Sequence, residues 1–275
     1  MHIAPSQSRS LLVDKQTTRL AAVGDLHVKK GSRGQLQPLL APVNDEADML
    51  LLCGDLTDYG LEEEALILAG ELKSAVHVPI AAVLGNHDYE SGQQDTVCRI
   101  LTDIGVKVLS GEACEIEGIG IAGAKGFAGG FGRSTLGAWG EPAVKRYVQE
   151  ALDEATRLEA ALARLRTQSR VALLHYSPIR ATVEGEPLEI FAFLGSSRLE
   201  EPLNRHPVSV VFHGHAHSGA PEGRTGSGTP VYNVAMPLML RTYPGRPPYR
   251  IVEIPSSPPS ETAALMSAAQ PQPRT

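Results

Sequence analysis

The chain has 275 residues, a length that accommodates one large α/β domain or two smaller ones. Its composition, with 42% hydrophobic and 20% charged residues, is ordinary for a globular protein. The net charge of -6 argues against nucleic acid as a partner, because a nucleic-acid-binding surface needs a basic face, and small substrates fit better. No apolar run reaches the roughly 18 residues of a membrane-spanning helix, and the N-terminus lacks a signal-peptide pattern. We therefore expect a cytoplasmic protein without a membrane span.

The sequence shows no internal repeat and no linker, so residues 16–254 are predicted to form a single domain. Residues 1–15 are polar and irregular, which suits a tail or a short edge strand. Residues 255–275 are rich in Pro, Ser and Ala and lack the apolar content to fold alone, so we expect a flexible C-terminal tail. The three cysteines have no C-x-x-C spacing and are expected to be free thiols.

The first part of the chain alternates short apolar runs with amphipathic segments. Strands are predicted where several apolar residues follow one another, and helices where apolar residues recur every three or four positions. The expected order is strand 20–23, short helical pieces within 36–43, strand 48–53, helix 61–75, strand 78–83, helix 93–104 and strand 106–109. This alternation indicates a largely parallel sheet covered by helices.

The second part begins with a predicted hairpin, which gives it a more antiparallel character. The hairpin is followed by a glycine-rich segment and by the strongest amphipathic helix, which Pro142 opens at a position where proline is favoured. The expected elements are strands 113–117 and 119–123, segment 126–140, helix 142–165, and strands 170–174, 208–212, 229–235 and 249–254.

Several of the predicted strands end in side chains that bind metals. A single Asp or His after a strand usually only stabilises a turn. Because such residues follow one predicted strand after another, the sequence predicts a metal centre. Imidazole, carboxylate and amide ligands suit manganese, iron or zinc. Two sites form if one carboxylate bridges them. The residues are Asp25, His27, Asp55, Asn86, His175, His215 and His217.

The order of these motifs, D-x-H, G-D-x-x-D, G-N-H-D, a lone His and G-H-x-H, resembles the calcineurin-like metallophosphoesterase superfamily, and the short motifs resemble its compact bacterial cyclic-phosphodiesterase branch. The resemblance implies an α/β fold, a four-layer α/β/β/α sandwich of two mixed sheets flanked by helices. It also implies two divalent or mixed-valence transition-metal ions (Mn, Fe or Zn). In that arrangement Asp25, His27 and His217 bind one ion, Asn86, His175 and His215 bind the other, and Asp55 bridges them.

Such a centre predicts a metal-dependent phosphoric ester hydrolase, in which a bridging hydroxide attacks phosphorus. His87 follows the ligand Asn86, and both are expected to contact substrate. His87 is expected to protonate the leaving group or to donate a hydrogen bond to it, the alternative being a residue that only orients a ligand. Asp58 resembles the family carboxylate that orients this histidine, the alternative being an ordinary turn aspartate. Tyr59 stands where protein phosphatases of the superfamily carry Arg, which argues against that class.

The glycine-rich segment 126–140 is interpreted as a flap that brings Arg133 to the substrate phosphate, the alternative being a surface loop. We expect a small phosphorylated substrate, with phosphodiesters, including cyclic nucleotides, ahead of monoesters. A phosphomonoesterase, a catalytically silent binding module on the same fold and a nuclease are the competing hypotheses. The sequence leaves the oligomeric state and the identity of the metals open.

Overall fold

The computed structural model describes residues 17–256, so the tail predicted at 1–15 and all but the first two residues of the tail predicted at 255–275 lie outside the described residues. Short 3-10 helices are labelled η. The chain first forms β1 (Thr17–Val23), α1 (Gln37–Leu40), α2 (Val43–Glu46), β2 (Met49–Cys53), α3 (Glu62–Ala75), β3 (Ile80–Val83), η1 (His87–Tyr89), α4 (Gln94–Asp103) and β4 (Lys107–Val108). It continues with β5 (Glu112–Ile116), β6 (Ile119–Gly123), η2 (Gly132–Ser134), α5 (Pro142–Arg164), β7 (Ser169–Leu173), η3 (Arg180–Val183), η4 (Leu188–Ile190), α6 (Phe191–Leu194), α7 (Ser197–Arg205), β8 (Val210–His213), β9 (Glu222–Arg224), β10 (Pro230–Asn233), α8 (Met236–Thr242) and β11 (Arg250–Pro255).

The strands of residues 17–256 form two stacked sheets. The first has the order β11-β1-β2-β3-β4, in which only β11 is antiparallel to its neighbour. The second has the order β5-β6-β7-β8-β10-β9, with an antiparallel strand at each edge and parallel pairs between them. The expectation of an antiparallel second part is therefore right for the hairpin β5–β6 and wrong for the centre of the sheet. Long connections through α5 and α7 return the chain to the same sheet edge and so permit parallel pairing.

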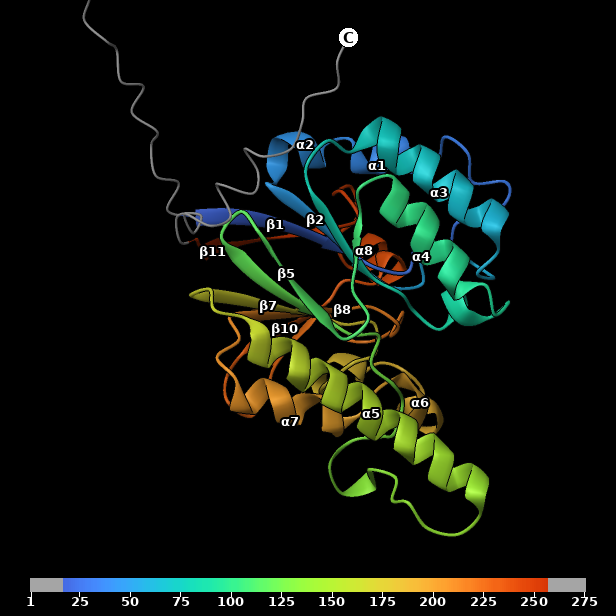
Figure 1. Ribbon diagram of the computed structural model, residues 1–275, viewed down its shortest axis with the longest axis vertical. Coiled ribbons are helices and arrows are strands. Elements are labelled where there is room, and N and C mark those ends of the chain that lie inside the picture. Colours follow the sequence, from blue (N-terminus) through green and yellow to red (C-terminus); the bar gives the residue numbers. More distant parts are fainter. Residues whose placement is uncertain (1–16, 257–275) are drawn as a thin grey trace, which may run out of the picture.

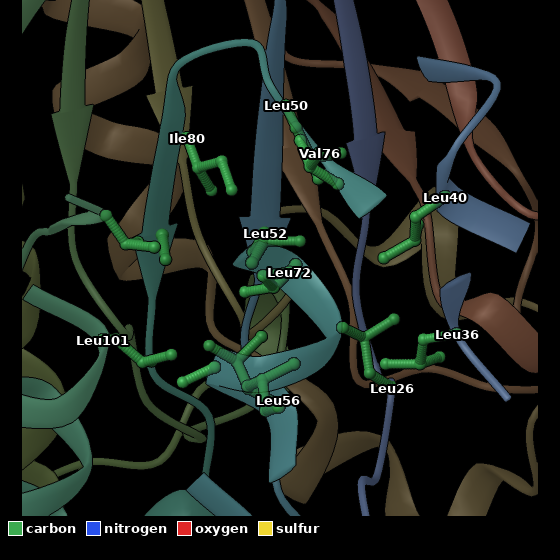
Figure 2. Packing of buried hydrophobic residues seen from close by; sticks show 14 of the residues in the cluster. Leu26, Leu36, Leu40, Leu50, Leu52, Leu56, Leu72, Val76, Ile80 and Leu101 are labelled. Atoms are coloured by element: carbon green, nitrogen blue, oxygen red, sulfur yellow. The ribbon is translucent and has the colours of Figure 1, made fainter. Parts of the chain in front are cut away.

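Successive side chains of a strand point to opposite faces of its sheet, and this alternation divides the interior into three apolar layers. Leu20, Leu51 and Val83 point into the space between the sheets, where they meet Val171 and Phe212. Their chain neighbours point the opposite way, toward the helices. Leu50 and Leu52 of β2 form one cluster with Leu72 of α3, Val76 at its end and Leu101 of α4. Figure 2 shows Leu36 and Leu40 of the same cluster at the right of the view, near Leu26.

A third layer joins the second sheet to α5 and α7 through Leu158, Leu162, Leu199 and Leu203. In Figure 1 the layers lie one below another, with α1 to α4 at the top, the two sheets in the middle and α5 and α7 below. This is the α/β/β/α sandwich of two mixed sheets that the resemblance implies, and the fold prediction is confirmed.

Local chemistry sets the helix ends. Glu64 accepts hydrogen bonds from the N–H groups of Tyr59 and Leu61 and caps the first turn of α3. The side chain of Ser196 accepts from the N–H of Arg198 and caps α7, a helix that the sequence pattern did not predict. Helix α8 and strand β9 are also additional to the expectation. Among the helices of residues 17–256, none has both the length and the apolar character that crossing a bilayer requires.

Candidate metal centre

The predicted ligands follow strands β1, β2, β3, β7 and β8, whose carboxyl ends meet at one edge of the sandwich. Four of these ligands have left-handed backbone conformations, which are rare for residues other than glycine: Asp25 (φ 58°), His27 (φ 44°), Asp55 (φ 48°) and His215 (φ 70°). Such conformations cost of order 1–3 kcal/mol each and persist where neighbouring structure holds them. Here the N–H of Asp25 donates to Gly54 O at 2.9 Å, and that of His27 to Asp55 O at 3.0 Å. The turns therefore hold each other in the conformation that aims the ligands.

Glycines before the ligands allow this crowding. A Cβ atom at Gly85 would lie 2.2 Å from Oδ1 of Asp55, and one at Gly214 would lie 2.3 Å from Oδ2 of Asp25. A Cβ at Gly54, whose φ is +80°, would lie 2.5 Å from Nδ1 of His175. Gly54, Gly85 and Gly214 thus each leave space that a proposed metal ligand occupies.

The first cluster consists of Asp25, His27 and His217, whose potential ligand atoms all lie within 4.8 Å of one another. Nε2 of His217 lies 2.9 Å from Oδ1 of Asp25, which is fully buried. The Asp25 carboxylate also accepts a hydrogen bond from the N–H of His215, at 2.9 Å to Oδ2. The His-x-His loop is therefore attached to the end of β1.

The second cluster consists of Asp55, His175 and His215, again with ligand atoms within 4.8 Å. Nε2 of His175 lies 3.3 Å from Oδ1 of Asp55 and 3.0 Å from Oδ1 of Asn86, which brings the Asn86 amide into the same group. The other Asp55 oxygen, Oδ2, lies 3.8 Å from Nε2 of His27. Asp55 therefore presents one oxygen to each cluster, the position required of a bridging ligand.

The charges in the centre shift the pKa values of its groups. Burial disfavours the charged forms of Asp55 and His175, but their mutual attraction outweighs it, so the pKa of Asp55 is lowered and that of His175 is raised to about 9. Burial, assisted by the nearby His175, lowers the pKa of His215 to about 4. Burial also lowers the pKa of His27, and a hydrogen bond to Asp25 raises that of His217. The ionised Asp55 carboxylate thus favours the protonated form of His175, whereas burial favours the neutral form of His27 and His215, the form in which an imidazole binds a cation.

The ring of His27 tests whether these residues fit a metal. Both of its nitrogens are buried, and among residues 17–256 neither has a hydrogen-bond partner, which is costly unless a cation binds one of them. Other rings are held by carbonyl oxygens: Nδ1 of His175 donates to Cys53 O, and Nε2 of His215 donates to Phe193 O. In the neutral rings, these contacts leave Nε2 of His175 and Nδ1 of His215 with lone pairs for a metal. The donor set fits first-row transition metals.

His87 lies beside the clusters and forms a further group with His27 and Asp55. Nδ1 of His87 donates to the backbone oxygen of Asp58 at 2.7 Å, which leaves its Nε2 unprotonated in the neutral ring. The Asp58 carboxylate instead lies 3.4 Å from Nδ1 of His27 and 3.3 Å from Nζ of Lys29. The sequence leads us to expect that the Asp58 carboxylate orients His87. In the structure the backbone carbonyl of Asp58, and not its carboxylate, holds the His87 ring.

Asp88 joins two of the ligand-bearing turns. Its buried carboxylate accepts hydrogen bonds from the N–H groups of Thr57, at 2.8 Å, and Gly85, at 2.8 Å, and from the Thr57 hydroxyl, at 2.6 Å. It therefore fixes the turn after β2 against the turn after β3. His213, next to the metal ligands in sequence, is also fully buried and contacts Thr182 and Gly214, so it belongs to the interior.

The glycine-rich segment is attached to the protein at its start and exposed at its centre. Phe131 packs with Val183, Leu194 and Ala216, whereas Arg133 is exposed and Trp139 is 72% exposed. Figure 1 shows the segment looping out beside the start of α5, at the bottom of the view. The structure thus gives Arg133 no contact with the clusters, and its role in binding phosphate stays a prediction.

Two contacts to the ligands were not anticipated from the sequence. The Tyr176 ring lies 4.4 Å, centroid to centroid, from that of His215, and the Phe193 carbonyl accepts from the same histidine. Tyr176 carries a sequence signal, because it directly follows the ligand His175. Phe193 carries none, because it lies 22 residues from His215 along the chain.

Comparisons with known proteins agree with this geometry. The profile of the calcineurin-like phosphoesterase family matches residues 18–219, and no protein of curated function matches the sequence. The structure of a phosphopantetheinyl hydrolase from Mycobacterium tuberculosis superposes with a TM-score of 0.61 at 15% identity, covering 85% of this chain and 95% of that chain. The structure of TT1561 from Thermus thermophilus superposes with a TM-score of 0.53 at 17% identity, covering 87% and 99%. These likenesses show the fold. The chain belongs to the calcineurin-like phosphoesterase family and is a metal-dependent phosphoric ester hydrolase.

Proposed function

We propose that the protein hydrolyses a phosphodiester of a small molecule, cyclic nucleotides included, at a centre of two metal ions. The observation that carries the proposal is the position of Asp55, which directs one oxygen toward His27 and the other toward His175. When bound, two ions of manganese, iron or zinc supply a nucleophile from water at neutral pH and neutralise charge on the phosphate oxygens. Asp25, His27 and His217 would hold one ion, and Asn86, His175 and His215 the other.

His87 supplies the proton transfer in this proposal. Because its Nδ1–H is bound to the Asp58 carbonyl, Nε2 is the atom that exchanges a proton with the leaving-group oxygen. Its backbone N–H also donates to Asp55, which fixes the position of the ring relative to the metal ligands. The Asp58 carboxylate acts through His27, whose imidazole it faces. Asn86 and His87 together would contact the bound phosphate.

The preference for diesters rests on charge. A monoester dianion gains more from an additional cationic side chain than a diester monoanion does. Tyr59 occupies the position where phosphoprotein phosphatases of the family have Arg, and Lys29 is engaged by Asp58. With tyrosine at position 59 and Lys29 paired with Asp58, neither of these side chains offers the metal centre a further cation, which favours a substrate with a single negative charge. Arg133 would contact the phosphate if its segment closes over the site.

The test is a panel of substrates assayed with manganese. Bis-p-nitrophenyl phosphate and cyclic nucleotides should be hydrolysed with higher kcat/KM than p-nitrophenyl phosphate. The reverse order would assign the protein as a phosphomonoesterase of small metabolites. Binding without turnover of any of them would assign it as a silent binding module. Asp55→Asn is the control, because it removes the proposed bridge and should abolish any turnover that belongs to this centre.

A further inference from the structure

A group of exposed apolar side chains lies in one short stretch, residues 187–194, which we call the apolar segment. Leu188 is 69% exposed, Phe193 58% and Ile190 38%. Phe191 and Leu194 of the same stretch point inward and pack with Phe131, Val183 and Ala216. The segment therefore has a buried side that attaches it and an outer side that presents apolar surface to solvent.

The apolar segment is attached to the loop that carries His215 and His217. At its C-terminal end, the carbonyl oxygen of Phe193 accepts a hydrogen bond from Nε2 of His215 at 3.1 Å. Just before its N-terminal end, the carboxylate of Glu186 accepts from the N–H of Ser218. These two contacts join the segment to His215 and Ser218, so its backbone borders the loop that carries two of the proposed metal ligands.

Backbone hydrogen bonds hold the segment in this position. The N–H of Gly129 donates to Ala192 O at 2.8 Å, that of Gly130 to Gly195 O at 2.9 Å, and that of Ser177 to Leu194 O at 3.1 Å. These bonds fix the backbone at residues 192–195, and Leu188, Ile190 and Phe193 present their side chains to solvent. Contiguous exposed apolar side chains in a protein mark a site of interaction.

The charges around the apolar segment bear on what occupies it. Glu184, Glu186 and Glu189 lie in or beside the segment, and the whole chain carries a net charge of -6. An anionic lipid surface attracts lysine and arginine, so acidic neighbours disfavour it. An uncharged apolar group tolerates them, and a substrate held by its phosphate at the metals would extend such a group over the bordering surface.

We propose that the apolar segment binds an aliphatic or aromatic group carried by the substrate next to its phosphate, so that this surface selects apolar esters. The inference rests on the proposed function for the position of the phosphate. Leu188, Ile190 and Phe193 form the contact, and the backbone of Phe193 links it to His215.

The experiment measures the binding of alkylphosphonates to the manganese-loaded protein by calorimetry, with octylphosphonate below its micelle concentration. Full burial of a methylene group stabilises the complex by about 0.8 kcal/mol, which is roughly a fourfold gain in affinity. Partial coverage contributes roughly half of that free energy, which is about a twofold gain in affinity per methylene. From methylphosphonate to octylphosphonate we expect a gain in affinity of about 100-fold. An affinity independent of chain length overturns the proposal.

Matched variants locate the effect. Leu188→Ser and Phe193→Ser should each reduce the octyl-to-methyl affinity ratio by about fivefold to tenfold, the loss expected for a half-exposed apolar side chain. Leu66→Ser, which alters a leucine that is 55% exposed on α3, should leave the ratio unchanged. Equal ratios in the three variants and the wild type would overturn the proposal even if octylphosphonate binds well.

Two further measurements separate the alternatives. Turnover of methyl and octyl p-nitrophenyl phosphate tests the proposed function: if neither ester is hydrolysed while the phosphonate ratio holds, the proposed function fails and the apolar site stands. If both are hydrolysed at equal kcat/KM and the phosphonate ratio is one, the apolar site fails and the proposed function stands. Binding to a membrane surface is tested by sedimenting the protein with phosphatidylcholine vesicles. If the wild type sediments with the vesicles and Leu188→Ser does not, the segment binds membranes and the proposal is overturned.

Discussion

The backbone N–H of His87 donates a hydrogen bond of 2.8 Å to Oδ1 of Asp55, 32 residues away along the chain. The residue proposed to transfer a proton is therefore bound through its backbone to the residue proposed to bridge the metals. Because the bond uses the main chain of His87, the imidazole can be removed without removing the contact. The roles of the two side chains can thus be tested separately.

Asp55→Asn should lower the occupancy of both metal sites and nearly abolish activity. The amide oxygen can still accept the hydrogen bond from His87, so the loss reports the missing negative charge between two cations. Metal content is measured by elemental analysis after dialysis against manganese. Two fully occupied sites in this variant would show that Asp55 does not bridge.

His87→Ala should retain both metals and lower kcat by about 10²–10⁴, the usual contribution of a positioned acid. The loss should be smaller for p-nitrophenyl esters than for alkyl esters, because p-nitrophenolate leaves without protonation. His77→Ala, at an exposed position beyond α3, serves as the control and should match the wild type. An equal loss with good and poor leaving groups would rule out the acid role.

Gly85→Ala should destabilise the centre, because a Cβ at this position would lie 2.2 Å from Oδ1 of Asp55 and 2.3 Å from its backbone nitrogen. We expect reduced metal content and a lower melting temperature. Gly70→Ala is the matched control: Gly70 is exposed in α3, and a Cβ added there would meet nothing within 4 Å, so alanine should stabilise the helix by about 0.4–1 kcal/mol. A Gly85→Ala variant with full metal content would show that the turns adjust more freely than this packing implies.

Arg133→Ala tests whether the glycine-rich segment takes part in catalysis. If the segment closes over the site, kcat/KM should fall about tenfold, corresponding to roughly 1.4 kcal/mol of transition-state binding, with metal content unchanged. Arg146→Ala removes an exposed arginine from α5 and should have no effect. Unchanged kinetics in both variants would leave the segment as a surface loop.

The fold and the meeting of the proposed ligands at one edge were predictable because both depend on local patterns. Apolar runs that end in Gly-Asp, Gly-Asn or Gly-His identify the strand ends, and parallel pairing brings strand ends together. The residues Asp25, Asp55 and His215 accordingly meet at one edge. The motif glycines could be recognised as well, since each precedes a ligand.

Contacts between distant segments were not predictable. Helix α7 contains Pro202, which obscured its amphipathic pattern, and its packing on α5 is what returns the chain for parallel pairing in the second sheet. Asp58 was expected to act through its carboxylate, yet whether side chain or carbonyl faces His87 depends on the turn conformation. The contact between Phe193 and His215 depends on the path of the intervening loop, which no periodicity encodes.

The most direct test of the central claim is anomalous diffraction from crystals of the manganese-loaded protein. We expect two anomalous peaks about 3.5–4 Å apart. One should lie against Asp25, His27 and His217, the other against Asn86, His175 and His215, and both should lie within ligand distance of Asp55. A single peak, or two peaks that do not share Asp55, would contradict the binuclear centre proposed for this protein.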